Sequence, residues 1–118
     1  MSVIGKNPKN DIYYGTGGGP EGVLAAAALS CFGGQIQGRL VLNEEEKIRA
    51  RKLGIQDFNK KYNIDDMVKG DVIFCATGVT TGDLADGVKD LGNEYEVSSF
   101  VLHKSENTIK NIKNIYNK

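Results

Sequence analysis

The stretch YYGTGGGPEGVLAAAALSCFGG, residues 13–34, decides the fold of this chain because three kinds of local signal meet in it. The residues that lead into it, 11–16, predict a short strand that runs into the glycines. Pro20 stands where a helix would begin, and proline is favoured at the first helical position because its missing N–H would be unpaired there anyway. We therefore predict a strand, a glycine turn and a helix that begins at Pro20 and continues over 23–32, where the following glycine pair ends it.

The predicted helix over 23–32 is unusual because it is apolar on nearly every side. Its large apolar side chains are spread around the circumference, and its alanines keep the surface between them thin. A helix that is apolar all round is typical of a buried position. We expect this helix to lie in the core, where its alanines let neighbouring elements approach closely.

Further along the chain, strand and helix patterns alternate. Asn43 followed by Glu46 is a capping-box signal, and it predicts a charged surface helix over 44–53. The apolar run over 72–76 is typical of a strand that is buried on both faces. The remaining predictions are strands over 36–42 and 95–103 and short helices over 64–69 and from Thr81 onward.

The tail of the chain carries two conflicting signals. Ile109, Ile112 and Ile115 recur at a spacing of three, which favours a helix, whereas β-branched residues in a short segment favour a strand. We predict a strand. The complete order of elements predicts a single domain over 1–118 of the α/β class, with a mixed β-sheet flanked by helices in layers.

The composition limits the classes of function. Lysine plus arginine and aspartate plus glutamate number 15 each, so nothing favours a nucleic-acid surface or an anionic membrane as the partner. Cys31 and Cys75 lie in apolar runs, which suits buried thiols in a reducing cytosol. The first residues do not form a signal-peptide pattern, and the apolar run inside 22–38 is too short to span a bilayer. We expect a cytoplasmic protein.

The glycine turn predicts an anion-binding site. The first backbone N–H groups of a helix have no internal partner, and the helix dipole places partial positive charge there. Gly17, Gly18 and Gly19 would let a ligand touch the backbone directly. A formal match to the dinucleotide motif G-x-G-x-x-G runs from Gly17 to Gly22, but a carboxylate inside it would repel a pyrophosphate, and a P-loop lysine is missing.

Glu21 is the carboxylate in that turn, and its position has two interpretations. A glutamate in the first turn of a helix stabilises the helix through the dipole, by about 0.3–1 kcal/mol. Alternatively, the dipole keeps the side chain ionised as a ligand for a hard divalent cation such as Mg²⁺ or Mn²⁺. First-turn acids are common, so the residue types alone leave both interpretations open.

Three segments together resemble a known family. GGGPEGVLAAAALSCFGGQIQGRL (17–40), RKLGI (51–55) and DDMVKGDVIFCATGVTTGDL (65–84) are similar to the C-terminal part of the class II (GlpX-type) fructose-1,6-bisphosphatases. The family pattern is close to G-G-A-P-E-G-V, then Q-G-R-L, then A-T-G-V-T. Gly19 departs from it, where alanine is common, and this is a change between small residues.

The resemblance implies a function and a cofactor. The family hydrolyses the 1-phosphate of fructose 1,6-bisphosphate in gluconeogenesis, using Mn²⁺ or Mg²⁺, and some members accept sedoheptulose 1,7-bisphosphate. By position, Glu21 corresponds to a metal ligand, and Gly18 corresponds to a backbone contact with the sugar phosphate. We expect Gly17 and Gly19, on either side of Gly18, to belong to the same substrate-binding turn. The resemblance places no catalytic residue in this segment.

The resemblance also implies that the chain is one part of a larger enzyme. The family is much longer, and its other metal carboxylates lie in an upstream catalytic half. We therefore expect a C-terminal segment that is inactive alone, needs that half as a partner and forms homo-oligomers. Two alternatives remain: a stand-alone, non-catalytic module that binds a phosphorylated small molecule, and a nucleotide-binding half of an oxidoreductase, which Glu21 disfavours.

Overall fold

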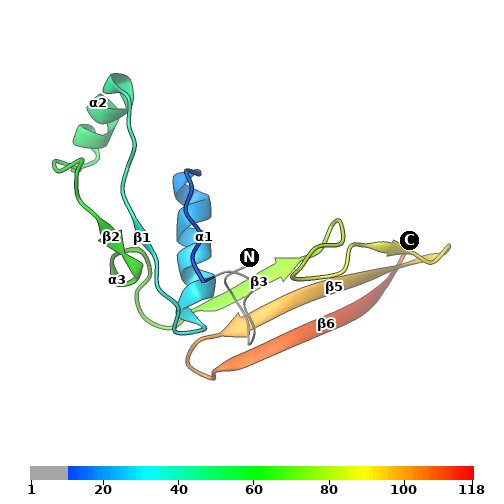
Figure 1. Ribbon diagram of the computed structural model, residues 1–118. Helices are drawn as coiled ribbons and strands as arrows, with labels where there is room; N and C mark the ends of the chain where they lie inside the picture. The colour runs from blue at the N-terminus through cyan, green and yellow to red at the C-terminus, as the bar shows by residue number, and fades with distance from the viewer. Residues whose placement is uncertain (1–10) are drawn as a thin grey trace.

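The computed structural model describes residues 11–118, and in this part of the chain short helices precede a long β-hairpin (Figure 1). The longest helix of the described residues is α1 (Gly19–Ser30), which stands at one end of the main sheet. In chain order, the elements are α1 (Gly19–Ser30), β1 (Gln37–Gly38), α2 (Glu44–Lys52), β2 (Tyr62–Asn63), α3 (Ile64–Met67), β3 (Ile73–Thr77), β4 (Lys89–Asp90), β5 (Glu94–His103) and β6 (Thr108–Asn117).

The main sheet is organised around β5. Strand β6 runs along one edge of β5 for its full length, and β3 and β4 follow each other along the opposite edge. The small sheet pairs only β1 with β2. Every strand pairing within residues 11–118 is antiparallel. The α/β content is as predicted, but the mixed sheet is not, because the strands return through hairpins and loops and not through helical crossovers.

The core consists of two small clusters that meet on α1. On one side, Ala28 and Cys31 pack against Phe100 and Leu102 of β5. On the other side, Ala26 and Leu29 pack against Ile64 of α3. The alanines allow this close packing, as expected, and they make α1 the element that joins the sheet to the remainder of the chain.

The first turns of α1 differ from the expectation of complete burial. Val23 is 47% exposed and Leu24 is 59% exposed, because the two clusters contact only the C-terminal half of the helix. The helix begins at Gly19 with proline in its first turn and ends before Gly33, whose φ is +68°. The limits predicted from proline and the glycine pair are therefore close to those observed.

Three strand predictions were wrong in extent or burial. Residues 11–16 form no strand, and Tyr14 is 97% exposed. The strand predicted over 36–42 is reduced to β1, which has only the two-residue β2 as a partner. Strand β3 is not buried on both faces: exposed and half-buried residues alternate along it, and Ile73 is 64% exposed.

The segment after β3 is a loop, where we predicted a helix from Thr81. The loop closes on itself: the backbone N–H of Val88 donates to the carbonyl of Val79 at 3.1 Å, and the hydroxyl of Thr81 accepts from Gly87 N at 3.0 Å. Gly78 is required there, because a Cβ would overlap the carbonyl of Asp86. These cross-loop contacts leave no room for a helical turn.

Other local predictions were confirmed. Asn43 and Glu46 form a complete capping box at the start of α2, with N···O distances of 2.8 and 2.9 Å, and Gly54 follows the helix with a φ of +87°. Helix α3 is shorter than predicted. Strand β5 matches its predicted range closely, and the tail is a strand, because ten consecutive residues of β6 pair with β5.

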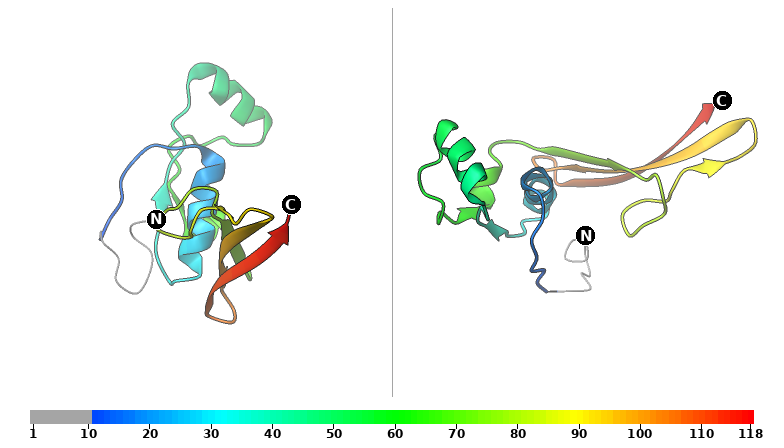
Figure 2. Two further views of the ribbon diagram at one scale, coloured as in Figure 1. Left: turned by 90° about the vertical axis from the view of Figure 1, so that its right-hand side faces the viewer. Right: turned by 90° about the horizontal axis from the view of Figure 1, so that it is seen from above.

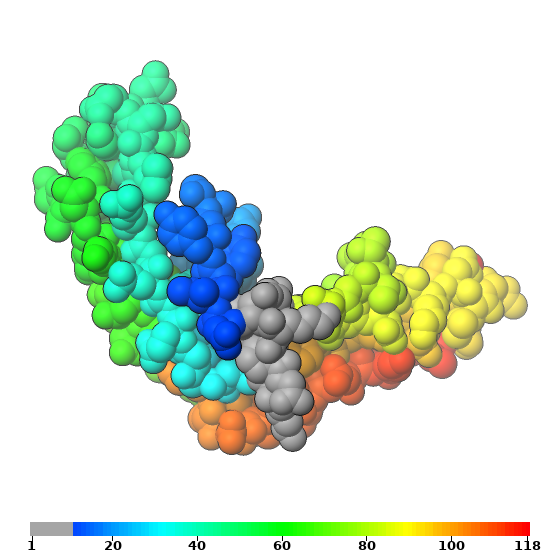
Figure 3. Space-filling view, viewed as in Figure 1, coloured from blue at the N-terminus to red at the C-terminus, as the bar shows by residue number. Residues whose placement is uncertain are grey.

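The molecule is elongated. Its principal extents are 53 × 30 × 26 Å, and its radius of gyration is 17.5 Å, whereas a compact chain of this length would have about 13.5 Å. Figure 3 shows the α2 arm and the hairpin diverging from the base of α1. No helix in residues 11–118 is long and apolar enough to cross a membrane.

Candidate functional site

The glycine turn lies at the free end of α1, away from the sheet (Figure 1). Gly18 is the N-cap residue, with φ −67° and ψ 150°, and its carbonyl accepts the first helical hydrogen bond from Gly22 N at 3.0 Å. Among residues 11–118, no side chain forms a capping hydrogen bond at this end. Because the first N–H groups of a helix have no internal partner, the turn presents backbone donors to a ligand.

The side chain of Glu21 folds back over the turn. A Cβ added to Gly18 would overlap the Oε2 atom of Glu21 and would lie 3.0 Å from its Cδ. By contrast, Gly17 and Gly19 have no atom within 4 Å of the corresponding position. The structure thus brings Glu21 and Gly18 together, leaves open space beside the other two glycines, and keeps all four residues exposed.

This turn offers one carboxylate to a metal ion. Residues 11–118 contain no group of three or more His, Cys, Asp or Glu side chains that could hold a metal. Glu21 is accessible, so it can serve as one oxygen ligand, but a divalent cation needs several more. The described residues therefore fit a contribution to a metal site and do not complete one.

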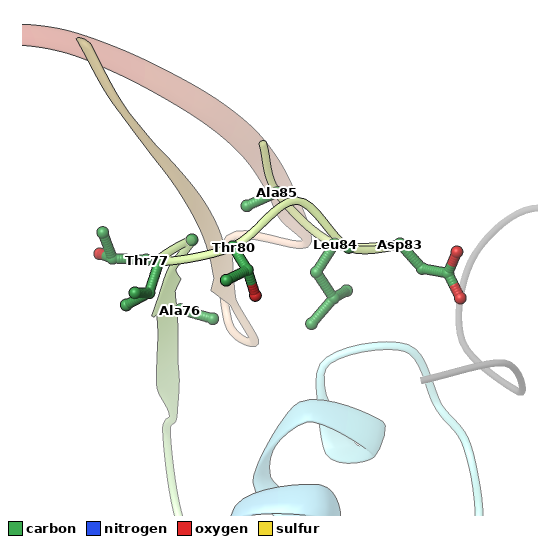
Figure 4. Close-up of a pocket in the computed structure, with 9 residues that line it drawn as sticks. Ala76, Thr77, Thr80, Asp83, Leu84 and Ala85 are labelled. Atoms are coloured by element: carbon green, nitrogen blue, oxygen red, sulfur yellow. The ribbon is translucent and has the colours of Figure 1, made fainter. Parts of the chain in front are cut away.

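A second candidate is the open hollow of about 430 Å³ that follows β3. Residues 76–80 and 82–85 line it (Figure 4). Figure 4 shows Leu84 pointing down from the loop toward the helix below it, and Leu84 packs against the core cluster, whereas Asp83 points sideways from the loop. A second hollow adjoins this one and is lined by residues 82–86, 98–99 and 111–113. Glu21 lines neither hollow, so the glycine turn and the hollow after β3 are separate candidate sites in this chain.

Sequence reasoning missed a polar cluster that forms between β3 and the β5–β6 turn. The carboxylate of Asp71 accepts hydrogen bonds from Ser105 N at 3.0 Å and Ser105 Oγ at 2.8 Å, and it lies 2.8 Å from His103 Nε2. Glu106 lies on the other ring nitrogen at 3.3 Å. Only the register that pairs Ile73 with His103 brings these residues together, and no spacing in the sequence reveals it.

The cluster stabilises a turn and does not activate a nucleophile. The hydrogen bonds from Ser105 and then His103 lower the pKa of Asp71, and the nearby Asp71 carboxylate raises the pKa of His103. His103 therefore donates from Nε2 to Asp71, and that nitrogen cannot accept the hydroxyl proton of Ser105. The serine also donates to Asp71, so it lacks the general base that a nucleophilic serine needs.

Comparison with known proteins identifies the family. A family model described as bacterial fructose-1,6-bisphosphatase, glpX-encoded, matches residues 1–116. The chain is 36% identical over 121 aligned positions to fructose-1,6-bisphosphatase class 2 of Haemophilus influenzae. It is 34% and 31% identical, over alignments of the same length, to fructose-1,6-bisphosphatases 1 and 2 of class 2 of Escherichia coli K12.

These alignments cover most of this chain and a minority of each relative. They include 90% of the chain, 36% of the Haemophilus influenzae enzyme and 36–37% of the two Escherichia coli enzymes. The chain thus spans little more than a third of the length of these relatives. The match of the family model over nearly every residue and the agreement with three class 2 enzymes show that the chain belongs to the family of glpX-encoded bacterial fructose-1,6-bisphosphatases.

Proposed function

We propose that the chain is part of a metal-dependent sugar-bisphosphatase that hydrolyses the 1-phosphate of fructose 1,6-bisphosphate in gluconeogenesis. Glu21 supplies one ligand to Mn²⁺ or Mg²⁺, and the backbone of Gly17, Gly18 and Gly19 contacts the sugar phosphate. The observation that carries the proposal is the position of the Glu21 carboxylate over Gly18, at an accessible helix N-terminus in a member of this family.

The local geometry supports both roles. The free N–H groups and the dipole at the start of α1 favour an anion. The open space beside Gly17 and Gly19 leaves the backbone accessible to a phosphate. When bound, a divalent ion would polarise a phosphoryl oxygen and activate a water molecule. Gly18 keeps the carboxylate close to the turn, so the anion and the cation would meet at one place.

The remaining ligands come, in this proposal, from an upstream part of the enzyme. The accessible surface of the chain is 8797 Å², whereas a compact monomer of this mass exposes about 6,300 Å². The exposed first turns of α1 and the open α2 arm account for part of this excess. We infer that an upstream segment covers these surfaces and completes the site, and that the chain alone does not turn over substrate.

Reconstitution tests the proposal. Phosphate release from fructose 1,6-bisphosphate with Mn²⁺ is measured for the chain alone, for the chain mixed with the upstream portion of a class 2 relative, and for the same mixture carrying Glu21→Gln. We expect turnover only in the mixture and a loss of at least about 100-fold with Glu21→Gln, because a metal ligand is missing. Glu45→Gln is the matched control, since it too removes an exposed first-turn glutamate.

Two results would contradict this proposal. Robust turnover by the chain alone would show that the upstream part is not needed. Full activity of the Glu21→Gln mixture, equal to that of the Glu45→Gln control, would exclude Glu21 as a metal ligand.

A second candidate function is a non-catalytic module that binds a phosphorylated small molecule. The uncapped N-terminus of α1 favours it, because backbone donors alone can hold a phosphate there. Thermal shift separates the two candidates. A shift with fructose 1,6-bisphosphate that requires Mn²⁺ supports the phosphatase part, whereas a metal-independent shift with phosphate ligands supports the module.

A further inference from the structure

Strand β6 has an open edge. All ten of its residues pair with β5 on one side, and no strand in residues 11–118 lies on its other side. Figure 1 and the left panel of Figure 2 show β6 as the outer border of the sheet. Nine of its residues are exposed. An edge strand of this length presents a row of backbone donors and acceptors that another strand can pair with.

The sequence of β6 is complementary to itself in one antiparallel register. Its three isoleucines, Ile109, Ile112 and Ile115, are evenly spaced by three. If two copies pair antiparallel with Ile112 opposite Ile112, then Ile109 of each copy lies opposite Ile115 of the other. Residues directly opposite each other share a face of the sheet, so β-branched side chains meet in every one of these pairs.

The same register keeps the positive charges apart. Lys113 faces Asn111, and Lys110 faces Asn114, so no lysine lies directly opposite another lysine. The charge of Lys113 is already balanced within the chain, because its Nζ lies 2.9 Å from the Asp86 carboxylate. Like charges directly opposite each other would destabilise the pair.

Neighbouring registers lose these matches. A pairing centred on Lys113 would place two lysines opposite each other and would set Ile112 against Asn114. A pairing centred on Asn111 would set both Ile109 and Ile112 against lysines. Since a shift in register changes every pair at once, the pattern selects the register centred on Ile112.

We propose that the β6 edge is an interface for a second copy of this chain, with two β6 strands antiparallel and Ile112 on the two-fold axis. The two main sheets then form one continuous antiparallel sheet. Because Phe100 and Leu102 face α1 in each copy, both α1 helices lie on the same face of it.

Charge complementation at the axis tests the proposal with the full chain. Ile112 is 38% exposed, so a charge there is tolerated by the monomer, and far-UV circular dichroism checks the fold. We expect the wild-type chain to dimerise in sedimentation equilibrium, and Ile112→Lys and Ile112→Glu each to weaken dimerisation at least 100-fold. An equimolar mixture of the two variants restores a dimer. Ile73→Lys, an exposed site on β3 at the opposite edge, is the control and leaves dimerisation unchanged.

Disulfide formation tests the register. In a Cys75→Ser background, which removes the exposed thiol, Ile112→Cys cross-links two identical chains, because Cα atoms of directly opposite residues lie within the range that a disulfide spans. Ile115→Cys alone does not cross-link, but it does so when mixed with Ile109→Cys. Three results would each overturn the proposal. The wild-type chain is monomeric, the mixture of Ile112→Lys with Ile112→Glu stays monomeric, or Ile115→Cys cross-links with itself.

Discussion

Truncation of Leu102 should separate α1 from the sheet, because this side chain forms the centre of the cluster that holds them together. Leu102 is 0% exposed and is the largest fully buried side chain in the described residues. It packs with Ala28 of α1 and with Cys31 directly after this helix, and in the sheet it stands between Phe74 and Ile109. The strand register fixes these two neighbours, so they cannot move far into the space that Leu102→Ala leaves.

The expected loss in the free energy of unfolding follows from the number of buried carbon atoms that Leu102→Ala removes. Leucine to alanine deletes three carbon atoms, which contribute about 0.8 kcal/mol each when buried, or about 2.4 kcal/mol in all. The space that the fixed neighbours cannot fill adds about 1 kcal/mol. We expect the free energy of unfolding to fall by about 3 kcal/mol. With a urea m-value of about 1.5 kcal/mol per molar, the unfolding midpoint falls by about 2 M.

Urea titration followed by circular dichroism measures this effect. Ile73→Ala is the matched control, because Ile73 lies on the same sheet but is 64% exposed, and we expect it to cost less than about 1 kcal/mol. Leu102→Met conserves volume and should cost less than about 1.5 kcal/mol. If Leu102→Ala were no more destabilising than Ile73→Ala, the assignment of Leu102 as the centre of the core would be refuted.

Three further predictions concern local features. His103 lies between Asp71 and Glu106. Its pKa is raised from the ordinary value of 6.5, so it contributes stability that is complete below pH 6.5 and is lost as the pH rises through the folded pKa. The pKa of Asp71 is lowered from the ordinary value of 3.8, so Asp71 contributes stability that is present above pH 3.8 and is lost as the pH falls through the folded pKa. The urea midpoint of the wild type should therefore exceed that of His103→Gln most clearly between these limits, and a constant difference at all pH values would contradict the ion pair. Asn43→Ala removes the capping box of α2 and should cost about 1 kcal/mol, seen as faster amide exchange in that helix only. Gly78→Ala places a methyl group against a backbone carbonyl of the loop and should destabilise the chain by at least about 1 kcal/mol in the same titration, unlike Gly17→Ala, which has open space.

Local signals in the sequence were sufficient to predict those elements whose ends are set by contacts within a few residues. The capping box of Asn43 and the glycine pair after α1 set helix ends through contacts within a few residues, so they could be predicted. Strand β5 was also predictable, because its alternation of apolar and polar residues reflects one covered face. The same holds for the position of Glu21 at the opening turn of α1.

The errors arose where distant segments decide the structure. The apolar run of β3 suggested burial on both faces, but the described residues cover only one of them. The strand expected over 11–16 has no pairing partner among these residues, and the loop after β3 is fixed by contacts of Gly78 and Gly87 across it. The grouping of Asp71 with His103 depends on a register that no local pattern encodes.

The two thiols of the chain differ in accessibility, and the difference depends on the packing of α1 against the sheet. Cys31 is buried in the cluster beneath the helix, and burial raises the pKa of its thiol, whereas Cys75 is exposed on β3. An alkylating reagent should therefore modify Cys75 at once and reach Cys31 only when the helix lifts from the sheet. When reclosing is faster than alkylation, the ratio of the two labelling rates measures the fraction of molecules in which the helix has lifted, without a probe being introduced.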